Sequence, residues 1–153
     1  MLVDQDPVAL AVAMRLAQRM GLGDHVEIHC RRLFDQWGGP VALDKVLRGR
    51  RIDIDKDSGL REYLPDNIYR SLTRQSWRSL KPDGLMISGD MNAARPQPES
   101  LHGMMGWRPS VKMRTIRAGI DLHAAAGVPR RCTRVEGTPE GVYSLFFSYK
   151  SAR

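Results

Sequence analysis

Apolar residues recur along this chain at two spacings, and together they predict an α/β protein. Spacings of three and four residues predict helices, which fall over 7–20, 66–80 and 110–126. Short apolar or alternating runs predict strands, which fall over 2–4, 26–30, 52–57, 85–92, 131–135 and 142–149. Strands that alternate with helices favour a parallel sheet covered by helices on both faces. The last two strands are separated only by a turn at 137–141, so we expect them to pair antiparallel.

The stretch from Asp57 to Asn92 carries the clearest pattern, a turn followed by a helix, a tight stop and an apolar strand. Asp66 is placed to cap the helix, Pro82 cannot continue it, and Gly84 permits the turn into the strand. The expected apolar face of this helix consists of Ile68, Tyr69, Leu72, Ser76, Trp77 and Leu80.

The amino-terminal part predicts a strand end, a helix and a second strand. Asp6 can cap the helix, and Pro7 suits its first position because that residue needs no amide hydrogen bond. Gly21 ends the helix. The expected buried stripe of this helix consists of Ala9, Val12, Ala13, Leu16 and Met20. A turn at 37–40 and a short helix over 41–47 follow the second strand.

Length and composition fit one globular domain over residues 1–153, with 42% hydrophobic and 27% charged residues. No apolar run approaches the roughly 18 residues of a membrane span, and the amino terminus is not a signal peptide. Cys30 and Cys132 show no metal-ligand spacing, so we expect two inert thiols in a reduced, cytoplasmic setting and no metal site.

The formal net charge of +7 comes mostly from arginine, in clusters such as 48–51 and 130–131. Such a balance attracts nucleic acid, and it equally describes an arginine-rich solvated surface. We favour the surface interpretation, because no basic motif is interleaved with aromatic residues.

Two motifs together resemble a known family. The first is Ser58-Gly59-Leu60-x-Glu62-x-x-Pro65-Asp66, and the second, one helix later, is the run Leu80-Lys-Pro-Asp-Gly-Leu-Met-Ile87. The pair resembles the fourth strand, helix and fifth strand of class I S-adenosylmethionine-dependent methyltransferases, with Asp83 in place of a glycine in the turn. The carboxy-terminal part resembles bacterial methyltransferases whose acceptor is undefined. The resemblance implies a Rossmann-like sheet, S-adenosylmethionine as cofactor and an unidentified, small-molecule methyl acceptor.

The resemblance also assigns cofactor-binding residues. Asp4 takes the position of the acid that binds the adenosine ribose, since one carboxylate can accept both ribose hydroxyls. Asp57, Ser58 and Gly59 follow the fourth strand of the family and are expected to face the cofactor.

The adenine position departs from the family pattern. Arg31 and Arg32 stand where the family often carries an acid, and arginine cannot accept a hydrogen bond from the adenine amino group. Either Asp35 takes that role, or backbone and apolar contacts around Leu33 and Phe34 hold adenine.

The acceptor side is less defined. By resemblance Arg61, Glu62 and Tyr63 lie near the substrate, and the loop over 92–106 builds part of its pocket. Glu62 and Tyr63 are candidates for a base by position only, so the catalytic residue is left unknown. His123 is expected to be a helix or core residue rather than a base.

No glycine-rich cofactor loop and no first strand of the family are found in this sequence. We therefore expect an incomplete methyltransferase domain that lacks its first strand, self-associates through exposed sheet edges and is weak or inactive as an enzyme. Two other classes stay open: a non-catalytic remnant or regulatory binding module, and a basic nucleic-acid-binding protein.

Overall fold

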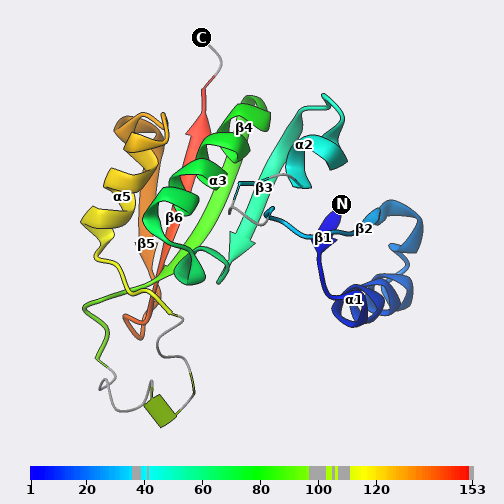
Figure 1. Ribbon diagram of the computed structural model, residues 1–153, viewed down its shortest axis with the longest axis horizontal. Coiled ribbons are helices and arrows are strands. Elements are labelled where there is room, and N and C mark those ends of the chain that lie inside the picture. The colour runs from blue at the N-terminus through cyan, green and yellow to red at the C-terminus, as the bar shows by residue number, and fades with distance from the viewer. Residues whose placement is uncertain (36–38, 41, 97–102, 105, 107–110, 152–153) are drawn as a thin grey trace. The chain divides into compact units, whose positions relative to one another are not determined.

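The chain divides into two compact units, residues 1–50 and residues 51–153, which are described separately (Figure 1). The computed structural model describes residues 1–35, 39–40, 42–96, 103–104, 106 and 111–151. The predicted turn at 37–40, the loop over 92–106 and the start of the helix predicted from 110 therefore lie partly outside the described residues. No helix in the described part of the chain has the length and apolar character needed to cross a membrane.

The first unit is built on two short parallel strands. Its elements are β1 (Leu2–Asp4), α1 (Pro7–Arg19), the 3-10 turn η1 (Gly23–His25), β2 (Ile28–Cys30) and α2 (Ala42–Leu47). β1 pairs with β2 in a register that joins Asp4 to Cys30. As predicted, Asp6 caps α1, because its carboxylate accepts a hydrogen bond of 2.8 Å from the amide of Val8.

The predicted buried stripe of α1 is wrong. Leu10 and Ala17 are its buried residues, whereas Val12, Leu16 and Met20 are 51%, 57% and 63% exposed. The spacing of four residues that links these three side chains is real, but both sides of α1 carry apolar residues, so the spacing did not identify the buried side.

The second unit contains a mixed four-stranded sheet. Its strands are β3 (Ile52–Ser58), β4 (Leu80–Met91), β5 (Thr133–Gly137) and β6 (Tyr143–Lys150), in the order β3-β4-β6-β5. β3 and β4 are parallel, and β6 runs antiparallel to both β4 and β5. The predicted antiparallel pair at the carboxyl terminus is confirmed, and within this unit β3 is an edge strand among the described residues.

The predicted turn at 81–84 lies inside β4. The helix before it ends at Ser79, and β4 already begins at Leu80. The pairing of β3 with β4 slips there, because Ile52 opposes Leu80 whereas Ile54 opposes Leu85. Asp83 takes a positive φ of 62° within the slip, so the backbone does turn locally and then rejoins the same strand.

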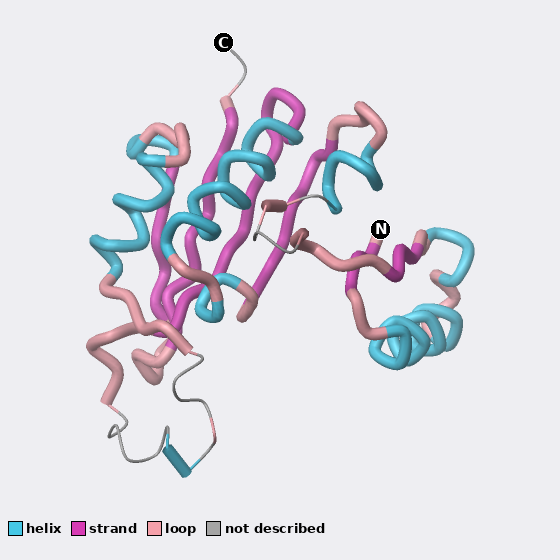
Figure 2. The backbone as a smooth tube through the Cα atoms, viewed as in Figure 1, coloured by secondary structure: helices cyan, strands magenta, loops and turns pink. Residues whose placement is uncertain are grey.

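Two α-helices of the second unit, α3 (Asp66–Ser79) and α5 (Ile116–Ala125), cover one face of the sheet (Figures 1 and 2). Ile54 and Tyr149, which lie in one row across the other face of the sheet, remain exposed. The expectation of helices on both faces is therefore not met by the described α-helices of this unit.

Asp66 does not cap α3, contrary to the sequence prediction. It is the first residue of the helix, Pro65 precedes it, and no side-chain cap is formed. Its carboxylate is instead engaged by Arg114, which is distant in sequence and could not be anticipated from local spacing. α5 does receive a cap, because Thr115 accepts a hydrogen bond of 3.2 Å from the amide of Ala118.

The apolar core of the second unit lies between α3 and the sheet. Leu80, Met86 and Val128 form a buried cluster, against which Ile52 and Trp77 pack. Under α5 the packing is very close, because a Cβ added to Gly119 would overlap the ring of the buried Phe146. The same covered face carries several buried polar residues, and these define the candidate site.

Candidate functional site at the carboxyl edge of the sheet

Three polar side chains gather where β3 and β4 end and β6 begins. Glu62 lies in η2 (Arg61–Tyr63), the 3-10 turn that follows β3, whereas Asp90 lies near the end of β4. Tyr143 is the first residue of β6, which starts at the same edge because β6 is antiparallel to β4. In α/β proteins the carboxyl ends of parallel strands are the usual place for ligands.

Glu62 and Tyr143 form a direct pair. The Tyr143 hydroxyl donates a hydrogen bond of 2.7 Å to Glu62 Oε1, whereas the buried Oε2 has no hydrogen-bond partner among the described residues. Glu62 as a whole is only 3% exposed. Burial raises the pKa of Glu62, the Tyr143 hydrogen bond opposes that rise, and the nearby Asp90 adds to it.

Gly59 borders this pair. Its φ of +92° favours glycine, and a Cβ at this position would lie 3.7 Å from Glu62 Oε1 and 3.8 Å from the Tyr143 hydroxyl. The turn after β3 therefore brings Gly59 and Glu62, two of the predicted site residues, to the same place.

Asp90 is held by Arg114. Nη1 of Arg114 lies 3.2 Å from Asp90 Oδ1, and Nη2 lies 2.8 Å from Asp66 Oδ1. The same guanidinium donates to the carbonyl oxygens of Arg61 and Leu64, so it fastens the turn after β3 to the end of β4. Burial raises the pKa of Asp90 to about 6, although Arg114 and the Tyr69 hydroxyl oppose the rise.

Arg61 is buried rather than presented to a ligand. It is 0% exposed, and its Nη2 lies 2.7 Å from Asp57 Oδ2. It also donates to the Thr73 hydroxyl and contacts the Met86 sulfur. Asp57 and Arg61 thus neutralise each other beneath α3, and this pair positions the 58–63 turn. Tyr63, in contrast, is exposed.

His123 lies in a buried hydrogen-bond network of neutral groups. Its Nε2 is 3.2 Å from both the Tyr69 hydroxyl and Ser88 Oγ, and its Nδ1 is 3.2 Å from Ser148 Oγ. The Ser148 hydroxyl is also hydrogen-bonded to the Thr133 hydroxyl. Burial lowers the pKa of His123 to about 3. His123 is therefore a neutral residue of the helix α5 and the core, where the sequence placed it.

The first unit holds the remaining predicted residues. Asp4 stands at the carboxyl end of β1, is exposed, and accepts a hydrogen bond of 2.9 Å at Oδ1 from the amide of Asp6. Arg31 follows β2, and its amide donates to the carbonyl oxygen of Asp4 at 2.7 Å. The half-buried Leu33 follows two residues later. Asp4 and the 31–33 segment are thus neighbours at the carboxyl ends of two parallel strands.

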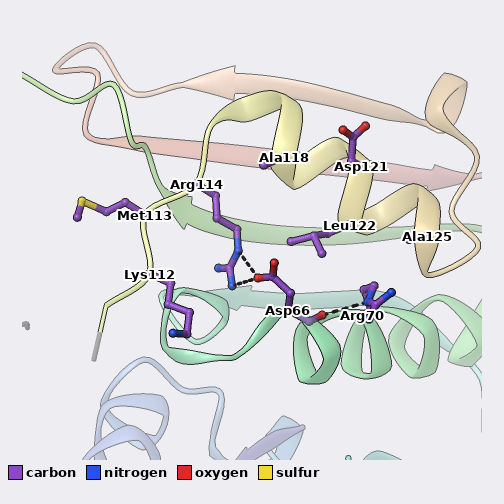
Figure 3. Close-up of a pocket in the computed structure, with 9 residues that line it drawn as sticks. All are labelled: Asp66, Arg70, Lys112, Met113, Arg114, Ala118, Asp121, Leu122 and Ala125. Atoms are coloured by element: carbon purple, nitrogen blue, oxygen red, sulfur yellow. Dashed lines mark hydrogen bonds and ion pairs between the residues drawn. The ribbon is translucent and has the colours of Figure 1, made fainter. Parts of the chain in front are cut away.

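A groove with a volume of about 790 Å³ lies between α3 and α5 (Figure 3). It is lined by Asp66, Arg70, Lys112, Met113, Arg114, Ala118, Asp121, Leu122 and Ala125. Figure 3 shows Arg114 pointing toward Asp66. None of the predicted cofactor or substrate residues lines this groove, and Arg114 is the lining residue that also pairs with Asp90 beside Glu62.

Sequence reasoning missed Asp90, Arg114 and Tyr143. One signal was available, because Ser88 and Asp90 are polar residues two positions apart in an apolar run. That alternation predicts a polar side of the strand, and both residues do face the helices. In the part of the chain that the structure describes, no group of three or more His, Cys, Asp or Glu could hold a metal ion. Cys30 and Cys132 are free thiols.

No family model matches the chain, and no curated protein matches it. Solved structures do. An O-methyltransferase family protein from Burkholderia thailandensis is 20% identical with a TM-score of 0.69, and the match covers 95% of this chain and 42% of that one. The fold is that of class I methyltransferases.

Two further solved structures agree with this fold. The O-methyltransferase family 2 protein from Planctomyces limnophilus, solved with apigenin, is 16% identical with a TM-score of 0.69, over 97% of this chain and 42% of that one. PigF, solved with SAH, is 15% identical with a TM-score of 0.61, over 93% of this chain and 41% of that one. The present chain thus spans less than half the length of each of these three proteins.

Proposed function

We propose that this chain is part of an S-adenosylmethionine-dependent methyltransferase that acts on a small-molecule acceptor. The observation that carries the proposal is the shared fold. A solved O-methyltransferase family protein aligns with 95% of this chain at a TM-score of 0.69, which supports a common fold for the β1-β2 pair and the β3-β4-β6-β5 sheet. A fold alone does not define a reaction, so the residues at the carboxyl edges of these sheets must also fit the cofactor.

The residues of the first unit fit the ribose part of the cofactor. The exposed carboxylate of Asp4 uses Oδ1 to hold the following turn. Oδ2 is thus left to accept a ribose hydroxyl. Arg31 and Arg32 offer donors only, so adenine would be held by the backbone and by the apolar side chain of Leu33.

In the second unit, Gly59 fits close approach of a ligand to the backbone, since it has no side chain and adopts a positive φ. Ser58 precedes it, and the Asp57 carboxylate is already committed to Arg61. We therefore assign Ser58 and Gly59 to direct cofactor contact and Asp57 to holding the turn. The cofactor would supply an electrophilic methyl group, and the protein would orient the acceptor and exclude water.

On the acceptor side, Glu62 and Tyr63 remain the proposed contacts, whereas Arg61 acts through its ion pair with Asp57. Small-molecule acceptors are supported by the likeness to a methyltransferase that was solved with apigenin. Apigenin belongs to the structure of the other protein, and it guides only the choice of test compounds.

Transfer of a labelled methyl group from S-adenosylmethionine to a panel of small phenols, amines and carboxylic acids tests the proposal. Because the sequence predicts a weak enzyme, we expect a low level of label in at least one phenol or amine. Binding of S-adenosylhomocysteine without transfer to any compound would instead favour a non-catalytic binding module. Absence of both binding and transfer, with salt-sensitive binding to nucleic acid, would favour the basic nucleic-acid-binding class.

A further inference from the structure

Glu62 has one feature that its place after β3 does not explain. Its Oε1 accepts a hydrogen bond from Tyr143, but its Oε2 is shielded from bulk water and has no hydrogen-bond partner among the described residues. A buried polar atom without a partner is costly, and a catalytic role is one of the explanations for such an atom in native proteins. The missing partner must be a hydrogen-bond donor, because a carboxylate oxygen only accepts.

The charged groups around Glu62 indicate whether the donor belongs to an anionic or a neutral ligand. Asp90 is close enough to interact electrostatically with Glu62, and its ion pair with Arg114 uses Oδ1. Arg61, the cation next in sequence, is turned inward to Asp57. A carboxylate or phosphate brought to Glu62 would therefore meet two acidic groups, whereas a neutral hydroxyl or an amine would meet an acceptor.

Tyr143 fixes the orientation of Glu62. Burial and the nearby Glu62 both raise the pKa of the Tyr143 hydroxyl, so this group stays protonated and keeps donating to Oε1. With Oε1 occupied, Oε2 is the atom left for a ligand. Gly59 has no side chain, so its backbone borders the pair directly, at a place where an added Cβ would contact both Glu62 Oε1 and the Tyr143 hydroxyl.

Resting on the function proposed above, we propose that the Tyr143–Glu62 pair receives the methyl acceptor, and that this acceptor is a neutral hydroxyl or amine compound. Its O–H or N–H donates to Glu62 Oε2. When the acceptor oxygen or nitrogen bonds to the methyl carbon, the carbon–sulfur bond breaks with its electron pair on sulfur. The proton lost by the acceptor passes to Glu62 Oε2, which becomes a carboxylic acid. Glu62 is the catalytic residue, and Tyr143 is its positioning residue.

The test compares Glu62→Gln with Glu136→Gln in the full chain. Both substitutions remove one negative charge, but Glu136 is exposed and pairs with the exposed Arg134. Glutamine retains an oxygen that can accept from Tyr143 and replaces the unpaired oxygen by a donor. Phenol, aniline and benzoate serve as probes, and their binding is measured by ligand-observed NMR with and without S-adenosylhomocysteine.

We expect phenol and aniline to bind the wild-type chain at least tenfold more tightly than benzoate. Glu62→Gln should remove that preference, and Glu136→Gln should preserve it. Tyr143→Phe removes the hydrogen bond that opposes the rise in the Glu62 pKa. Phenol binding should therefore become pH-dependent at a higher pH in this variant, which a merely structural role would not produce.

Equal binding of the three probes to the wild type, or an unchanged preference in Glu62→Gln, would overturn the inference. These binding results need no methyl transfer, so they are distinct from a failure of the proposed function. A chain that transfers methyl groups equally well with Glu62→Gln would keep the function and overturn the role of Glu62. A chain that binds no S-adenosylhomocysteine would overturn the function, and the probe preference would still decide the inference.

Discussion

The two units of this chain differ in the length of their strands and in the way they carry charge. Among the described residues, the unit 1–50 contains two strands of 3 residues each, whereas the unit 51–153 contains strands of 5 to 12 residues. In the first unit, Arg50 and Glu27 pair at 3.3 Å on the surface, with both side chains about half exposed. In the second, Arg114 and Asp90 pair at 3.2 Å with side chains only 6% and 1% exposed.

The difference indicates how each unit depends on its polar residues. Surface pairs contribute little, because water and salt screen them. Loss of one partner of a buried pair leaves an uncompensated charge in the interior. The second unit should therefore be sensitive to single polar substitutions, whereas the first should be sensitive mainly to its helix cap and its few buried apolar residues.

The largest expected effect is that of Arg114→Ala. It leaves Asp90 buried without its partner and frees two carbonyl oxygens, so we expect a loss of about 3–5 kcal/mol in the free energy of unfolding. The matched control in the other unit is Arg50→Ala, with an expected loss of about 1 kcal/mol or less. Urea unfolding followed by circular dichroism measures both. Similar losses for the two variants would remove the contrast between the units.

Gly119→Ala tests the close packing of α5 on the sheet. Its new Cβ would overlap the ring of the buried Phe146, so we expect destabilisation by about 1–3 kcal/mol. Gly103→Ala is the control, because no atom lies within 4 Å of its added Cβ. Thermal melting of both variants distinguishes the two sites, and a neutral Gly119→Ala would show that α5 packs more loosely than described.

The pH dependence of stability tests the buried His123. Its folded pKa of about 3 lies below its ordinary value of 6.5. The unfolded chain therefore takes up a proton first, and stability present above pH 6.5 falls as the pH decreases toward 3. The slope from this group is at most about 1.4 kcal/mol per pH unit.

Asp90 acts in the opposite direction, so a variant is needed to isolate His123. The Asp90 pKa is raised to about 6, and its contribution to stability is therefore lost as the pH rises through 6. His123→Gln should show a smaller loss of stability between pH 6.5 and 4 than the wild type in urea titrations. Parallel curves for the two proteins would place His123 outside the interior.

The smallest expected effect concerns the first unit. Asp6→Ala removes the cap of α1 and should cost about 1 kcal/mol. Asp24→Ala is the control, since Asp24 lies in the short turn η1 rather than at a cap. Helical signal and melting temperature measure both. If Asp6→Ala leaves both unchanged, the cap contributes nothing to this unit.

The sequence predicted the elements of this fold well because their signals are local. Asp6 and Pro7 predicted the start of α1, and the turn at 137–141 predicted the antiparallel pair of strands on either side of it. The structure contains both. Prediction from the sequence failed where a residue distant in the sequence determines what a side chain binds. Asp66 looked like a cap, but its carboxylate binds Arg114, 48 residues away. The α1 stripe failed because apolar residues occur on both sides of the helix.

The candidate site was predictable only in part for the same reason. Gly59 and Glu62 lie in one turn, so a local motif located both. Tyr143 joins Glu62 from 81 residues away, and Asp90 reaches the site through the end of β4. The spacing of residues in the sequence does not reveal contacts between such distant residues. The strand order β3-β4-β6 accounts for them, because it places the ends of these strands side by side.

The central claim, cofactor binding by this fold, is tested most directly by calorimetric titration of S-adenosylhomocysteine into the wild-type chain and Asp4→Ala. We predict saturable binding at one site and a loss of about 1–3 kcal/mol in Asp4→Ala, the scale of hydrogen bonds to a charged group. Asp6→Ala should bind as the wild type does. The absence of saturable heat, or equal affinity of the wild type and Asp4→Ala, would contradict the account.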